Sequence, residues 1–213
     1  MDHYIITIAR GLGSGGSHIA RNLSKELGIP CYDSEILNMA ADLSGINERF
    51  FYEANERIKK GSLAIKNSDG VYNHERVFRV EDKDYFSNEN LFNIQAQVIK
   101  NLAFDKNVSC IIIGKAANYI LRSLVNVVKI NIQAPEEKCI KNVMQRLQFN
   151  YEEAKKTIQQ TDKYRADYYK YYTGKEWLDP KEYHLSINTG TVTEEYAAQL
   201  IIKLLKDKKL IGE

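Results

Sequence analysis

The sequence has 213 residues, a mass of 24.5 kDa and a formal net charge of +2 at pH 7. This length is enough for one domain with a full hydrophobic core, and so small a net charge does not favour nucleic acid or a membrane surface as a partner. Because no apolar run approaches the length of a membrane span, we expect neither partner.

The three cysteines are far apart in the sequence and lie in apolar segments. Cys31, Cys110 and Cys139 are therefore interpreted as reduced core residues, which predicts a cytoplasmic protein. The four histidines show no metal-ligand spacing, so we expect no metal site built from protein side chains.

The chain begins with an apolar, β-branched segment, Ile5–Ile8, that predicts a buried strand. A turn with four glycines follows, and a helix with apolar residues at Ile19 and Leu27 then ends at Gly28. A strand, a glycine-rich turn and a helix in this order direct backbone N–H groups at a phosphate. We predict that Gly11–Gly16 binds phosphate; the alternative is a purely structural tight turn.

The glycine-rich loop fits two phosphate-binding patterns, and neither is complete. As G-x-G-x-x-G, from Gly11 to Gly16, it is similar to a dinucleotide-binding turn, and Asp33 lies about where such folds place a ribose-binding acid. As a P-loop, G-x-x-x-x-G-K-[ST], it lacks the lysine in either register. Ser17 and His18 take the Lys and Ser/Thr positions when Gly11 opens the loop, and Gly16 takes the lysine's position when Arg10 opens it. The loop alone leaves the choice open.

The next segments predict helices and one short strand. Residues 29–33 predict the strand, residues 34–43 and 47–60 predict two helices, and residues 88–101 predict a third. Residues 61–88 are polar and lack regular periodicity, which is typical of a functional flap or a disordered loop.

The second half contains the clearest buried strand, 108–113. Gly114 and Lys115 follow at its C-terminal end, where open parallel sheets bind their ligands. A short helix at 116–121, an apolar strand at 126–132 and a helix from Pro135 come next. Helices that alternate with continuously apolar strands predict an α/β fold, in which helices cover both faces of a parallel sheet.

Residues 151–180 are rich in charges and tyrosines and have helical character as far as Thr173. One interpretation is a surface helix that packs on the sheet through its aromatic face. The other is a cationic lid, because phosphoryl transfer needs cations around the transferred group. The candidate lid cations are Arg146, Lys163, Arg165, Lys170 and Lys175. A strand at 183–187 and an amphipathic helix at 194–208 complete the predicted elements.

Five segments occur together in a known family: ITIARGLGSGG, IPCYDSEIL, IIIGKAANYILR, VMQR and the tyrosine-rich DKYRADYYKYYTGKEWLDPKEYHLSINTG. They resemble the cytidylate kinase-like family of P-loop proteins. The resemblance implies a single domain, 1–213, that is a three-layer α/β sandwich of the nucleoside monophosphate kinase type. It also implies a monophosphate-binding insert at 60–90, a helical lid at 146–182, ATP with Mg²⁺ as donor, and a nucleotide such as CMP or dCMP as acceptor.

The resemblance and the charge pattern assign roles to individual residues. The expected phosphate-binding residues are Gly11, Gly13, Ser14, Gly15, Gly16, Ser17 and His18. His18 either contacts the nucleotide or simply lies at the start of the helix. The expected catalytic residues are Arg10, Arg146, Asp162 and Arg165. The expected substrate-binding residues are Asp33, Lys115, Lys163 and Lys175.

The chain departs from true cytidylate kinases at the P-loop lysine, replaced by Gly16, and at an acid replaced by Ala116. A working kinase then needs another cation at the outer phosphates. We expect Arg10 to supply it, with Lys115 and Lys175 as further candidates. The alternative for Arg10 is a salt bridge that braces the loop.

Three functions fit this sequence. The favoured one is an ATP-dependent phosphotransferase acting on a nucleoside monophosphate or a similar small acceptor, because a lid with arginines and a long central insert suit phosphoryl transfer. The others are a nucleotide-binding protein without catalysis on a kinase fold, and an NAD-binding oxidoreductase. The oligomeric state is not predicted by any feature of the sequence.

Overall fold

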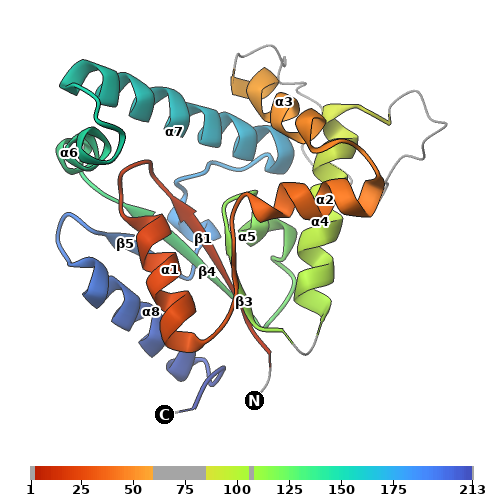
Figure 1. The fold of residues 1–213 in the computed structure, drawn as a ribbon. Helices are drawn as coiled ribbons and strands as arrows, with labels where there is room; N and C mark the ends of the chain where they lie inside the picture. The colour runs from red at the N-terminus through yellow and green to blue at the C-terminus, as the bar shows by residue number, and fades with distance from the viewer. Residues whose placement is uncertain (1–2, 60–84, 106–107, 213) are drawn as a thin grey trace.

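The computed structural model describes residues 3–59, 85–105 and 108–212. Within these ranges five strands form one parallel sheet in the order β2-β3-β1-β4-β5 (Figure 1). The strands are β1 (Ile5–Arg10), β2 (Cys31–Tyr32), β3 (Cys110–Ile113), β4 (Val127–Gln133) and β5 (Leu185–Asn188). The predicted parallel sheet is confirmed. Most of the expected insert, 60–84, lies outside the described residues.

Helices cover both faces of the sheet (Figure 1). One face carries α1 (Gly16–Leu27) and α8 (Glu194–Asp207). The opposite face carries α2 (Glu35–Ser44), α4 (Asn88–Phe104), α5 (Ala117–Ile120) and the end of α7 (Tyr151–Thr173). The remaining elements are α3 (Glu48–Lys59), α6 (Glu136–Leu147) and the 3₁₀ turn η1 (Pro180–Glu182). No helix among the described residues is long and apolar enough to cross a membrane.

The central strand β1 connects both cores and carries the loop. Its alternating side chains place Ile6 and Ile8 in the core under α1 and α8, and Ile5 and Ala9 in the opposite core. Because β1 pairs in parallel with both β3 and β4, its last residue, Arg10, lies in the middle of the carboxyl edge of the sheet. Ligands of open parallel sheets bind at that edge.

Helix α7 is fixed at both ends. Asn150 and Glu153 form a capping box at its start, and Gly174, with φ of 68°, ends it. Near its end, Tyr172 is buried and stacks on Phe92 of α4, with ring centroids 3.9 Å apart. The aromatic face predicted for this helix therefore packs in the core, and the preceding turns of α7 lie over the carboxyl edge of the sheet (Figure 1).

Two predicted elements are shorter than expected. The strand predicted at 29–33 contributes only Cys31 and Tyr32, which pair with β3 at the edge of the sheet. The helix predicted at 116–121 is reduced to α5, because Gly114, Lys115 and Ala116 have φ values of 72°, 53° and 53°. This left-handed run after β3 is costly for residues other than glycine, and such strain is commonly found at functional sites.

Candidate functional site

The loop between β1 and α1 has its carbonyl groups occupied by protein donors. The Gly11 carbonyl accepts from the Ser14 hydroxyl at 2.8 Å, and the Gly13 carbonyl accepts from Asn142 Nδ2 at 2.8 Å. The Ser14 carbonyl accepts from Thr189 Oγ1 at 2.8 Å. Because the C=O and N–H of a trans peptide point in opposite directions, the bond from Thr189 to the Ser14 carbonyl leaves the Gly15 N–H facing away from Thr189.

Several N–H groups of this loop remain free. Within the described part of the chain, those of Gly13, Gly15 and Ser17 have no acceptor. Gly13 and Gly15 adopt φ of 82° and 84°, the left-handed backbone from which anion-binding turns are built. These groups line a pocket of about 680 Å³, the phosphate pocket, which Arg21 and Arg146 also line. Such a surface can bind a polyphosphate.

Two of the residues expected to bind phosphate have other contacts. Ser14 is fully buried and its hydroxyl holds the loop together, so its side chain does not line the phosphate pocket. The His18 imidazole Nδ1 contacts the carboxylate of Glu194, at the start of α8. Glu194 also lies against Gly15 and lines the phosphate pocket, a position that the sequence did not indicate.

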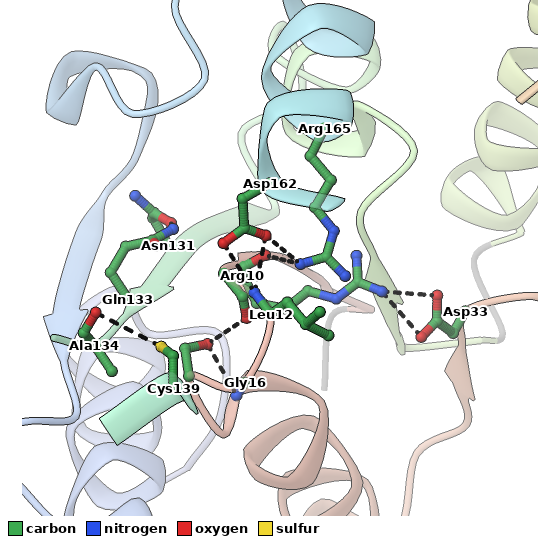
Figure 2. Close-up of polar contacts among 12 residues, drawn as sticks. Arg10, Leu12, Gly16, Asp33, Asn131, Gln133, Ala134, Cys139, Asp162 and Arg165 are labelled. Carbon is green, nitrogen blue, oxygen red and sulfur yellow. Dashed lines mark hydrogen bonds and ion pairs between the residues drawn. The ribbon is translucent and has the colours of Figure 1, made fainter. Parts of the chain in front are cut away.

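Helix α7 brings Asp162 and Arg165 onto the loop (Figure 2). The Leu12 N–H donates to both carboxylate oxygens of Asp162, at 2.9 and 3.1 Å. Arg165 Nη1 donates to Asp162 at 2.9 Å and to the Arg10 carbonyl at 2.8 Å. The three-residue spacing places both side chains on one helical face, so they can pair in the way that the spacing predicts.

This pair is largely shielded from water. Burial raises the pKa of Asp162, although Arg165 and the Leu12 N–H act in the opposite direction. Burial also lowers the pKa of Arg165 to about 10, and Arg10 adds to this effect. Arg165 nevertheless stays charged at neutral pH, so the pair is an ionic contact between α7 and the loop.

Arg10 lies between two pockets. Its Nη2 donates to both carboxylate oxygens of Asp33 at 3.2 Å, which is visible in Figure 2. Its Nε is buried and has no hydrogen-bond partner in the described residues. Arg10, Asp33 and Arg165 line the phosphate pocket and also a second pocket of about 290 Å³, the aromatic pocket. The two pockets therefore share a charged wall.

The aromatic pocket has rings on its other walls. They belong to Tyr164, Tyr168, Tyr169 and Trp177. Asn118 fixes one wall by donating to the Tyr169 hydroxyl at 2.8 Å, and Tyr183 fixes another by donating to the Trp177 carbonyl at 2.6 Å. A compact ligand with a flat face and a negative charge suits such surroundings.

Lys115 supplies a further cation to the aromatic pocket. Among the described residues no acid lies within ion-pair distance of its ammonium group. Burial lowers the pKa of Lys115 to about 8, and Arg10 and Arg165 act in the same direction while Asp33 opposes them. An anionic ligand would therefore meet an ammonium group that forms no ion pair with any acid of the described residues.

Lys163 and Lys175 are not brought to the site. Neither residue lines either pocket. Lys163 is exposed and pairs with Asp167 at 2.8 Å, and Lys175 pairs with Glu182 at 3.4 Å. Arg146, in contrast, lines the phosphate pocket.

The sheet order and the phosphate-type loop after β1 define a P-loop kinase-like α/β protein. The chain belongs to the cytidylate kinase-like family, whose model matches residues 5–191. No curated protein shows significant similarity to it.

Solved structures support this fold. A protein of uncharacterized function from Eubacterium ventriosum has a TM-score of 0.70 and 24% identity, over 96% of this chain and 99% of that one. Shikimate kinase from Acinetobacter baumannii, in complex with shikimate, has a TM-score of 0.51 and 16% identity, over 98% and 96%. A sugar kinase from Janibacter has a TM-score of 0.50 and 17% identity, over 96% and 93%.

Proposed function

We propose that the protein is an ATP-dependent phosphotransferase that moves the terminal phosphoryl group of ATP onto a small acceptor. The observation that carries this proposal is the wall of Arg10, Asp33 and Arg165 shared by the two pockets. A donor in the phosphate pocket and an acceptor in the aromatic pocket would meet beside two arginines. Positioning and positive charge at the transferred group are what phosphoryl transfer requires.

The phosphate pocket suits ATP that carries Mg²⁺. The free N–H groups of Gly13, Gly15 and Ser17 would bind phosphate oxygens, and Arg146 would add charge. The Ser17 hydroxyl would be an oxygen ligand of the kind that Mg²⁺ prefers. Mg²⁺ commonly binds through one or two protein groups and the phosphates, and when bound it neutralises charge on them.

The family suggests a nucleoside monophosphate such as CMP or dCMP as acceptor. The aromatic pocket offers rings for a base and the ammonium group of Lys115 for an anionic group. Asp33 lines the same pocket and would bind a hydroxyl group of the acceptor. The kinases of shikimate and of a sugar among the similar structures make non-nucleotide acceptors the second group to assay.

The thiols support the proposed cytoplasmic location. Cys31, Cys110 and Cys139 are all free, which supports a cytoplasmic protein, where thiols stay reduced.

A coupled assay of ADP formation tests the proposal. ATP and Mg²⁺ are offered with CMP, dCMP, the other nucleoside monophosphates, shikimate and common sugars, and thermal shift is followed with ATP and NADH. We expect ATP to raise Tm, NADH to leave it unchanged, and one acceptor class to yield ADP. If ATP raises Tm but no acceptor yields ADP, the protein binds nucleotide without this catalysis.

A further inference from the structure

Positions 10 and 16 of the loop cannot both carry a side chain. A Cβ atom placed on Gly16 would lie 2.5 Å from Arg10 Cβ and 3.2 Å from Arg10 Cγ. It would also lie 3.4 Å from Ile132 Cβ in the neighbouring strand. Because contacts under 3.0 Å do not occur between such atoms, the Arg10 stem fills the space in which a residue-16 side chain would begin.

This exclusion explains how the loop departs from the P-loop pattern G-x-x-x-x-G-K-S. That pattern has glycine at its first position and lysine at its seventh, whereas this chain has arginine at position 10 and glycine at position 16. Gly15 and Ser17 match the sixth and eighth positions of the pattern. The two departures are therefore coupled. The positively charged residue stands at position 10 instead of position 16, and the glycine stands at position 16 instead of position 10.

The guanidinium group of Arg10 is available for a phosphate. Its Nη2 contacts Asp33, whereas no hydrogen bond within the described residues occupies its Nη1, and the side chain is 15% exposed. A guanidinium group has five N–H donors in a fixed plane, so one edge can bind Asp33 while other donors bind phosphate oxygens. Arg10 lines both pockets, so its N–H groups lie where ATP and the acceptor would meet.

We propose that Arg10 is the catalytic cation that contacts the outer phosphates of ATP in place of the P-loop lysine, and that Gly16 provides the space it occupies. This inference rests on the proposed function. It differs from the simpler role of Arg10 as a brace for Asp33, because a brace would act on stability and would not distinguish nucleotides by their number of phosphates.

An exchange of the two residues tests the proposal. The four proteins are the wild type, Arg10→Gly, Gly16→Lys and the double variant, which restores the full pattern G-x-x-x-x-G-K-S. Calorimetry measures their affinities for ATP, inorganic triphosphate and AMP, and thermal unfolding measures Tm. No catalytic turnover is needed.

We expect Arg10→Gly to bind ATP and triphosphate at least about tenfold more weakly, with little change for AMP. Gly16→Lys alone should lose Tm through the clash with Arg10. The double variant should recover both Tm and ATP affinity to within about threefold of the wild type. Gly16→Lys would then be harmful in the wild type but beneficial in Arg10→Gly, which would show that the two positions are coupled.

Three results would overturn the proposal. If Arg10→Gly binds ATP as tightly as the wild type, Arg10 does not contact the outer phosphates and only braces Asp33. A double variant no better than the single variants would mean that the two positions are not coupled. Absence of ATP and triphosphate binding by the wild type would overturn the proposed function as well, which separates the two failures.

Discussion

The phosphate pocket and the aromatic pocket share a wall but are built in different ways. The phosphate pocket combines charged side chains with free backbone N–H groups of the glycine loop, a loop held together by hydrogen bonds to its carbonyls. The aromatic pocket is made of side chains from several elements, among them β1, β3, α5 and α7. Main-chain groups of a rigid loop suit a ligand common to many kinases, whereas side chains can be exchanged to change the acceptor.

The largest expected effect tests the backbone side of this comparison. In Gly15→Val the new side chain would meet the Glu194 carboxylate beside the free N–H groups, so ATP affinity should fall by at least about 100-fold. Gly45→Val is the matched control, because Gly45 has a similar φ of 71° and no neighbour within 4 Å. Both variants should lose about 1–2 kcal/mol of stability to left-handed strain, but Gly45→Val should bind ATP normally in calorimetry. Equal ATP affinities would contradict the site.

The next effect concerns the shared wall. Arg165→Ala removes a cation beside the reacting groups, so turnover should fall by about 100-fold, and Tm should also fall because Asp162 loses its shielded partner. Arg122→Ala is the control, because Arg122 also donates to one backbone carbonyl, that of Tyr119, at 2.9 Å, but lines neither pocket. Steady-state kinetics of ADP formation compares the two. A similar loss in both variants would argue against a role for Arg165 in transfer.

A smaller effect tests the side-chain pocket through its charge. The pKa of Lys115 in the folded state is about 8, below the ordinary lysine value of 10.5, so folding disfavours the charged form. This cost is fully present below pH 8 and disappears as the pH rises from 8 to 10.5. Lys115→Met should therefore be more stable than the wild type at pH 7 by about 1–2 kcal/mol, an amount reduced by partial exposure to water.

Denaturant unfolding at pH 7 and pH 10.5 measures this difference between Lys115→Met and the wild type. We expect the two free energies of unfolding to approach each other at the higher pH. A difference that does not depend on pH would mean that packing, and not the charge of Lys115, decides stability at this position.

The smallest effect concerns a single brace of the loop. Asn142→Ala removes the hydrogen bond to the Gly13 carbonyl, so the loop should lose order and ATP affinity should fall by about three- to tenfold. Gln97→Ala is the control, because it removes an exposed amide hydrogen bond of the same 2.8 Å length on α4. If ATP affinity is the same in both variants, the loop keeps its shape without Asn142.

The sequence could predict local features of the molecule but not contacts between distant parts of the chain. The glycine loop and the apolar strands are local patterns, so the parallel sheet and the place of the loop were predictable. The braces of the loop were not, because Asn142 and Thr189 lie 129 and 175 residues from the groups they bind.

Charge also proved a weaker guide than spacing in α7. Asp162 and Arg165 have a three-residue spacing and both reach the loop, whereas Lys163, one residue from Asp162, faces solvent. Neighbouring helical residues point about 100° apart, so the positive charge of a residue does not say which way it faces. The coupling of Arg10 with Gly16 needed the structure, because only the distance between them shows that one excludes the other.

The bond between Thr189 and the Ser14 carbonyl has a consequence for how the protein is made. The glycine motif is synthesised before either of these braces, because Asn142 lies on α6 and Thr189 follows β5. A nascent chain therefore carries the motif long before it can hold the motif in shape. We expect affinity for nucleotide to arise only when the last strand joins the sheet, so that ATP stabilises the completed fold and none of the shorter intermediates before it.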